Sequence, residues 1–167
     1  TMRTPVIAGN WKMNKTIVEA VNLVTAMKGP LAQVQGVDKI VCPAFVCLPA
    51  VKEAIGSAEI GLGAQNLYYQ ESGAYTGEVA PGMLEGLCQY VIIGHSERRA
   101  YFGETDETVN KKIAVGLGDA HGRLDADDVA VQPALAQQHA AEITGDHNGH
   151  IAQTAAVQHG QCRSASR

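Results

Sequence analysis

The sequence lacks the features that mark several large classes of protein. None of its apolar runs approaches the roughly 20 residues that cross a bilayer, and no long apolar segment of the signal-peptide kind lies near its start. The net charge of -4 argues against a surface for nucleic acid or an anionic membrane. Neither a Gly-x-Gly-x-x-Gly nor a Gly-x-x-x-x-Gly-Lys-Ser/Thr motif occurs, which disfavours a nucleotide-binding fold.

Cysteine is also scarce, and its spacing excludes the usual zinc and disulfide frameworks. No Cys-x-x-Cys pair is formed by Cys42, Cys47, Cys88 and Cys162. Cys42 and Cys88 fall in or beside apolar segments, as free thiols of a cytoplasmic protein do, and we expect that location. Most histidines lie after residue 117, but no His-x-x-x-His or His-Glu-x-x-His pair lies on a credible helix. We therefore expect no metal and no cofactor.

Aromatic residues and lysines disappear from the last third of the chain. The last aromatic residue is Phe102 and the last lysine is Lys112. The remainder is rich in Ala, Gln, His, Asp and Gly, and it has too few large apolar residues to form a core. This contrast predicts one domain over residues 1–117. Residues 118–167 are expected to form a poorly ordered tail of no assigned fold, with at most a weak helix at 134–143.

Segments of strand type and helix type alternate in the first domain. Short apolar runs predict strands at 5–9, 39–42, 60–64 and 90–93, and periodic or capped segments predict helices at 16–27, 46–55, 81–87 and from Thr105 onward. Gly29-Pro30 is expected to end the first helix. Four such strand–helix units indicate an α/β fold with a parallel sheet and right-handed crossovers. A doubly wound sheet and part of a (β/α)8 barrel both fit this pattern.

The junction after the fourth predicted strand carries the most informative residues. An apolar run ends at Gly94, His95 follows, and Ser96-Glu97 has a helix-start pattern. The partial positive charge of a helix N-terminus would keep the imidazole neutral, as a hydrogen-bond donor. His95 is therefore either a functional donor at a strand end, where parallel α/β folds bind ligands, or a histidine that caps a buried turn.

Other polar residues near predicted strand ends allow similar alternatives. Asn10 and Lys12 follow the first strand directly. Lys12 either binds a phosphate or a developing oxyanion or faces solvent. Asn10 either donates a hydrogen bond to the same oxygen or forms a hydrogen bond within a turn. Three roles are open to Glu97: general base, ion-pair partner of Lys12, or helix-cap carboxylate. Its place in a first helical turn favours the ion pair.

Residues 68–78 form a predicted loop that contains three tyrosines. Long ordered loops in compact domains are usually functional, and exposed tyrosines suit a protein interface. The alternative is a loop that folds back on its own domain.

Four motifs, in this order along the chain, resemble those of the triosephosphate isomerase family. They are Ala-Gly-Asn-Trp-Lys-Met-Asn at 8–14, Gly-Ala-Gln-Asn at 63–66, Gly-Ala-Tyr-Thr-Gly-Glu at 73–78 and Val-Ile-Ile-Gly-His-Ser-Glu-Arg-Arg at 91–99. The resemblance covers roughly residues 4–117. It implies the first four βα units of a (β/α)8, or TIM, barrel.

The resemblance also implies an activity, since this family interconverts dihydroxyacetone phosphate and glyceraldehyde 3-phosphate through an enediolate, in glycolysis and gluconeogenesis. The enzyme is itself a standard example of a glutamate base that works with a neutral histidine. By resemblance, His95 polarises the substrate carbonyl, Lys12 stabilises the enediolate and the phosphate, and Asn10 positions substrate. Glu97 pairs with Lys12 and joins proton transfer. The loop residues expected to enter the partner subunit of a homodimer are Tyr75, Thr76, Gly77 and Glu78.

The remaining parts of the family's site have no match in the tail. We identify no general base, closing lid or phosphate-binding glycines in residues 118–167. Loss of a base slows proton abstraction by roughly 10²–10⁴, so we expect poor or absent activity of this chain alone. The alternative is a non-catalytic fragment that binds or dimerises through the 68–78 loop. With four strands only, the first and fourth are expected to be open sheet edges.

Overall fold

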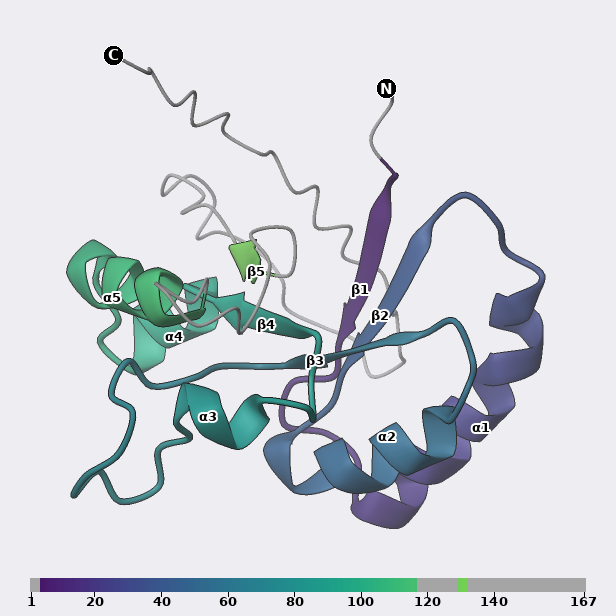
Figure 1. The fold of residues 1–167 in the computed structure, drawn as a ribbon, viewed down its shortest axis with the longest axis horizontal. Coiled ribbons are helices and arrows are strands. Elements are labelled where there is room, and N and C mark those ends of the chain that lie inside the picture. Colours follow the sequence, from purple (N-terminus) through teal and green to yellow (C-terminus); the bar gives the residue numbers. More distant parts are fainter. Residues whose placement is uncertain (1–3, 117–128, 132–167) are drawn as a thin grey trace, which may run out of the picture.

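The protein is built on a parallel sheet whose strands follow one another in chain order. The computed structural model describes residues 4–116 and 129–131. The strands are β1 (Val6–Asn10), β2 (Asp38–Cys42), β3 (Gly61–Ala64), β4 (Tyr90–Ile93) and β5 (Val129–Val131), in the order β1-β2-β3-β4-β5 (Figure 1). A doubly wound sheet reverses its strand order, whereas a barrel adds each strand beside the last. The sheet is therefore of the barrel type.

Helices connect these strands and pack on the sheet. They are α1 (Ile17–Ala32), the 3-10 turn η1 (Phe45–Cys47), α2 (Leu48–Ile55), α3 (Pro81–Leu84), α4 (Ser96–Tyr101) and α5 (Asp106–Gly116). Figure 1 shows α1 and α2 side by side, with α4 and α5 near the carboxyl end of β4. Thr16 and Glu19 form a capping box that begins α1. Thr105 Oγ1 accepts from the Thr108 amide at 3.3 Å, so it caps α5 as expected.

Two helix ends differ from the prediction. The expected end of the first helix at Gly29-Pro30 is wrong, because α1 continues to Ala32. Pro30 lies in the last turn, where its missing amide costs one hydrogen bond and the chain still closes, with the Gln33 amide donating to the Pro30 carbonyl at 3.2 Å. The third helix ends at Leu84 rather than residue 87, because Glu85 leaves the helical conformation with a ψ of 131° and Gly86 follows with a positive φ of 68°.

Apolar residues cover both faces of the sheet. The larger cluster lies between the sheet and the helices, and its fully buried members include Val24, Leu48 and Ile93. A smaller cluster on the other face contains Ile40, Cys42 and Ile92. Strands buried on both faces are typical of parallel sheets, including those of barrels.

A glycine in β3 makes room for this smaller cluster. A Cβ added at Gly63 would lie 2.6 Å from the Cys42 Sγ. Cys42 and Cys88 are buried free thiols, as their apolar segments predicted, and Cys47 is a third. Burial, with a smaller contribution from Cys88, raises the pKa of the Cys42 thiol to about 12, so it packs as a neutral apolar group.

One short segment of the predicted tail, residues 129–131, is among the described residues. The predicted helix at 134–143 lies outside the described residues. β5 lies in a region for which no fold was predicted, and it pairs with β4 in parallel, Val91 opposite Val129 and Ile93 opposite Val131. The expected open edge at the fourth strand is therefore wrong, because a three-residue run with two β-branched valines was too short to be recognised as a strand. No helix within the described ranges is long and apolar enough to cross a membrane.

Two valines on α1 give a matched test of this core. Val24 is fully buried and Val18 is 70% exposed. We expect Val24→Ala to lower the free energy of unfolding by about 1.5–3 kcal/mol, since it removes buried methyl groups, and Val18→Ala to change it by less than about 0.5 kcal/mol. Both changes alter helix propensity equally, so urea unfolding of the two variants isolates burial. Equal effects would show that α1 does not pack as described.

Candidate functional site

The polar residues singled out in the sequence meet at one edge of the sheet. Asn10 ends β1 and lies opposite Cys42, the last residue of β2, so the carboxyl ends of these strands are level. His95 follows β4 by two residues at the same edge. Across this edge the Lys12 Nζ donates to the Glu97 Oε1 at 2.7 Å, although the two residues are 85 positions apart.

His95 is the N-cap of α4, and its ring has a defined hydrogen-bond partner. The Nδ1 atom accepts from the Glu97 amide at 3.2 Å. It also lies 3.6 Å from the Glu97 Oε2, which is too long for a hydrogen bond. The backbone contact requires an unprotonated Nδ1, so the neutral ring carries its proton on Nε2. The two sequence-based alternatives are compatible, since one nitrogen caps the helix and the other can donate to a ligand.

Lys12 is held in an unusual backbone conformation by several contacts. Its φ is +54°, a left-handed value that costs a non-glycine residue on the order of 1–3 kcal/mol. The Lys12 amide donates to the Asn10 Oδ1 at 3.0 Å, and the Lys12 carbonyl accepts from the Gln65 Nε2 at 2.9 Å. The side chain is 47% exposed. Lys12 thus faces solvent and is positioned at the same time.

Of the three roles open to Glu97, the geometry supports the ion pair. The helix cap is supplied by His95 instead, and the Glu97 carboxylate reaches Lys12. With both side chains more than 40% exposed, this pair contributes only about 0–1 kcal/mol to stability. The ion pair therefore matters for the positions of the ammonium and the carboxylate rather than for stability.

Gln65 belongs to this site although no role was predicted for it. Its Nε2 donates to the carbonyls of Lys12 at 2.9 Å and Cys42 at 2.8 Å. It therefore joins the segment after β1 to the end of β2. A signal was present in the sequence, because Gln65 directly follows the third strand, at the edge where Asn10 and His95 lie.

The tyrosine loop, residues 68–78, projects from the domain. Figure 1 shows it extending away from the sheet between β3 and α3. Tyr68 packs against Tyr69 and Tyr75, with ring centroids 4.4 and 4.8 Å apart. Tyr75 is 42% exposed, and residues 71–78, including Thr76, Gly77 and Glu78, are all exposed. The loop has internal order, but its tip does not fold back into a core.

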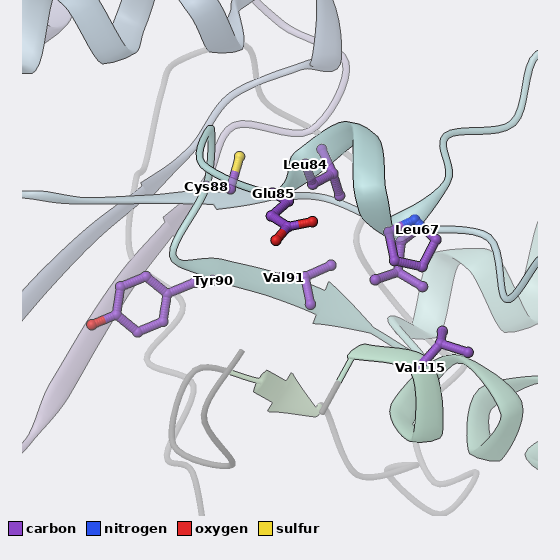
Figure 2. A pocket seen from close by; sticks show the side chains of 8 residues that line it. Leu67, Leu84, Glu85, Cys88, Tyr90, Val91 and Val115 are labelled. Atoms are coloured by element: carbon purple, nitrogen blue, oxygen red, sulfur yellow. The ribbon is translucent and has the colours of Figure 1, made fainter. Parts of the chain in front are cut away.

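Two hollows in the described part of the chain are separate from the Lys12, Glu97 and His95 side chains. The one in Figure 2 is lined mostly by apolar side chains, including Leu67, Val91 and Val115, and at about 10 Å³ it holds at most a water. The other, of about 520 Å³, is lined by Thr4, Asp38 and Gly61, at the amino ends of the strands. Ligands of parallel α/β folds bind at the carboxyl ends. The Lys12–Glu97–His95 arrangement is thus the stronger candidate site. Within residues 4–116 and 129–131, no group of three or more His, Cys, Asp or Glu could hold a metal.

Comparisons with known proteins agree on one family. The family model for triosephosphate isomerase matches residues 5–119. A triosephosphate isomerase of Dehalococcoides mccartyi (strain CBDB1) is 60% identical over 116 residues, 70% of this chain and 46% of the relative. One of Clostridium botulinum (strain ATCC 19397 / Type A) is 64% identical over 113 residues, 67% of this chain and 45% of the relative.

A solved structure extends this agreement to the fold. The crystal structure of triosephosphate isomerase from Bartonella henselae is similar with a TM-score of 0.63 and 35% sequence identity, covering 68% of this chain and 47% of that chain. The chain spans about half the length of the curated relatives it matches. The matched residues coincide with the part of the sequence that carries the four motifs. The chain belongs to the triosephosphate isomerase family.

Proposed function

We propose that this chain carries part of a triosephosphate isomerase active site, for the interconversion of dihydroxyacetone phosphate and glyceraldehyde 3-phosphate by proton transfer through an enediolate. The observation that carries the proposal is the joint placement of Lys12, Glu97 and His95 at the carboxyl edge of the sheet. Family membership supports the same reaction. The setting we propose is cytoplasmic glycolysis and gluconeogenesis.

The proposed roles follow from which atoms are already engaged. The His95 Nδ1 is occupied by the Glu97 amide, so its Nε2–H donates to the substrate carbonyl and moves a proton between the two enediolate oxygens. The Lys12 ammonium stabilises the negative charge that develops on those oxygens and attracts the phosphate. The Asn10 Oδ1 accepts from the Lys12 backbone, which leaves its amide N–H group to position substrate. Glu97 orients Lys12 and joins proton transfer.

No general base for the reaction is identified in this chain. We match no residue of 118–167 to the family's base, lid or phosphate-binding glycines. The groups in hand can bind and polarise a triose phosphate, but abstraction of the carbon-bound proton needs a base. We therefore propose low or absent turnover for the chain alone.

We also propose that two copies associate through the 68–78 loop. The support is the exposed tip at 71–78 together with the packing of Tyr68 at its base on Tyr69 and on Tyr75 of the tip. The loop would reach the Asn10 and Lys12 region of the second copy, as the resemblance implies. If catalysis is absent, this contact is the function that remains, a non-catalytic dimerisation module.

The isomerase assay tests the proposed reaction. We expect the purified chain to turn over dihydroxyacetone phosphate at least roughly 10²-fold more slowly than the full-length Clostridium botulinum relative. Any remaining turnover should be lost in His95→Gln. Turnover equal to that of the relative, or turnover indifferent to His95→Gln, would contradict this account.

Binding of substrate can be measured without turnover. We expect Lys12→Met to weaken binding of dihydroxyacetone phosphate about tenfold or more, because a charged hydrogen bond to the ligand is lost. Lys28→Met is the control, since the Lys28 Nζ donates to the Ala54 carbonyl at 2.9 Å, between α1 and α2. Titration calorimetry measures the affinity of both variants for dihydroxyacetone phosphate. Equal affinities would show that Lys12 does not contact the ligand.

Sedimentation tests the dimer. We expect Thr76→Arg to shift the chain toward monomer, because a long charged side chain at the loop tip would be forced into the contact. Thr25→Arg makes the same change on the exposed side of α1 and should leave the mass unchanged. A chain that is monomeric at micromolar concentration, or a dimer unaffected by Thr76→Arg, would refute the proposal.

A further inference from the structure

A buried carboxylate and a buried ammonium lie next to the segments that carry the proposed site. Glu104 is 8% exposed and Lys112 is 3% exposed. The Lys112 Nζ donates to the Asn66 Oδ1 at 2.7 Å and also to the Glu104 Oε1. The Arg98 Nε donates to the same Glu104 oxygen at 2.5 Å. We call Asn66, Arg98, Glu104 and Lys112 the buried cluster.

The carboxylate at its centre is ionised. Burial alone would raise the pKa of Glu104, but the hydrogen bonds and positive charges of Lys112 and Arg98 outweigh it, and the pKa lies below its ordinary value. Both cations share Oε1, while Oε2 is buried without a hydrogen-bond partner in the described part of the chain. A single oxygen atom thus joins two helices and a loop.

The buried cluster connects the two segments that form the site. Asn66 follows Gln65, which holds the Lys12 carbonyl. Arg98 follows Glu97 in α4, the helix capped by His95. The Lys12–Glu97 contact completes a closed ring of interactions that begins and ends at Lys12.

The other ion pairs that α4 forms in the described part of the chain are weak anchors. The helix is six residues long and none of its residues is buried. Its second arginine, Arg99, reaches Asp106 at 2.7 Å, but that carboxylate is 85% exposed. Arg99 also donates to the Gly94 carbonyl at 3.1 Å, a contact to the segment that directly precedes the helix. Exposed pairs are too weak to fix a helix, and the same holds for Lys12–Glu97. The contact from Arg98 to the buried Glu104 is the strong one.

We propose that Glu104 and Lys112 are positioning residues, which hold α4 and the segment after β3 at the spacing that keeps His95 and Glu97 opposite Lys12. The proposal rests on the proposed function for its catalytic meaning. Its geometric content is independent of turnover, because it concerns the Lys12–Glu97 contact in the chain itself.

Two variants separate positioning from stability. Glu104→Leu/Lys112→Met replaces the buried pair by apolar side chains, a change that proteins often tolerate, yet it removes the contacts to Asn66 and Arg98. Arg98→Met keeps the Glu104–Lys112 pair and so keeps the fold, but frees α4 from the cluster. Glu107→Gln is the control, since it breaks a surface ion pair on α5.

The readout is the ¹H–¹⁵N NMR signal of the Lys12 ammonium, assigned by its absence in Lys12→Met, together with the melting temperature. In Glu107→Gln we expect the signal of the full chain, and in Glu97→Gln, which breaks the contact directly, we expect it to be shifted or lost to exchange with water. In each folded variant of the buried cluster we expect the same change as in Glu97→Gln, because α4 no longer holds the carboxylate beside the ammonium. A folded Arg98→Met or double variant with an unchanged Lys12 signal would overturn the proposal. Failure of the full chain to bind dihydroxyacetone phosphate, with these spectral changes present, would count against the proposed reaction alone.

Discussion

Parallel pairing of consecutive strands is the constraint on which the rest of the structure depends. Because β1 to β4 run in the same direction and in chain order, the residues that follow each strand arrive at one edge. Asn10, Gln65 and His95 come from three different strand ends and yet share one site. A shift of β1 by one residue against β2 would turn Ile7 and Gly9 to the opposite face and move Lys12 away from Glu97.

The site depends on exposed charges that cannot hold themselves in place. Lys12 and Glu97 are both half exposed, and Lys12 has a strained backbone. The Asn10 and Gln65 side chains bind the Lys12 backbone, and the buried cluster restrains α4 from behind. The solvated charged groups are available for a ligand, while buried polar contacts determine where they are.

Much of the fold and part of the site could be predicted from the sequence. The four strands were found because each is a short apolar run bounded by glycine, proline or a polar residue, and the His95 junction was found because a helix-start pattern follows a strand. The end of α1 was missed because a proline in the last turn is tolerated, and β5 because three residues carry little pattern. Gln65 was missed although its place directly after the third strand was a signal. The buried cluster could not be predicted, since its contacts join residues such as Asn66 and Lys112 that only the tertiary fold brings together. Lys112 in particular was placed on a helix by the sequence, with nothing to show that it is buried.

The central claim is that Lys12 and His95 face one triose phosphate at the carboxyl edge of the sheet. A crystal structure of the chain with dihydroxyacetone phosphate tests it most directly. We expect the carbonyl oxygen of the ligand within hydrogen-bond distance of the His95 Nε2 and the Lys12 Nζ. A ligand bound instead in the hollow near Thr4 and Asp38, at the opposite edge, would contradict the account.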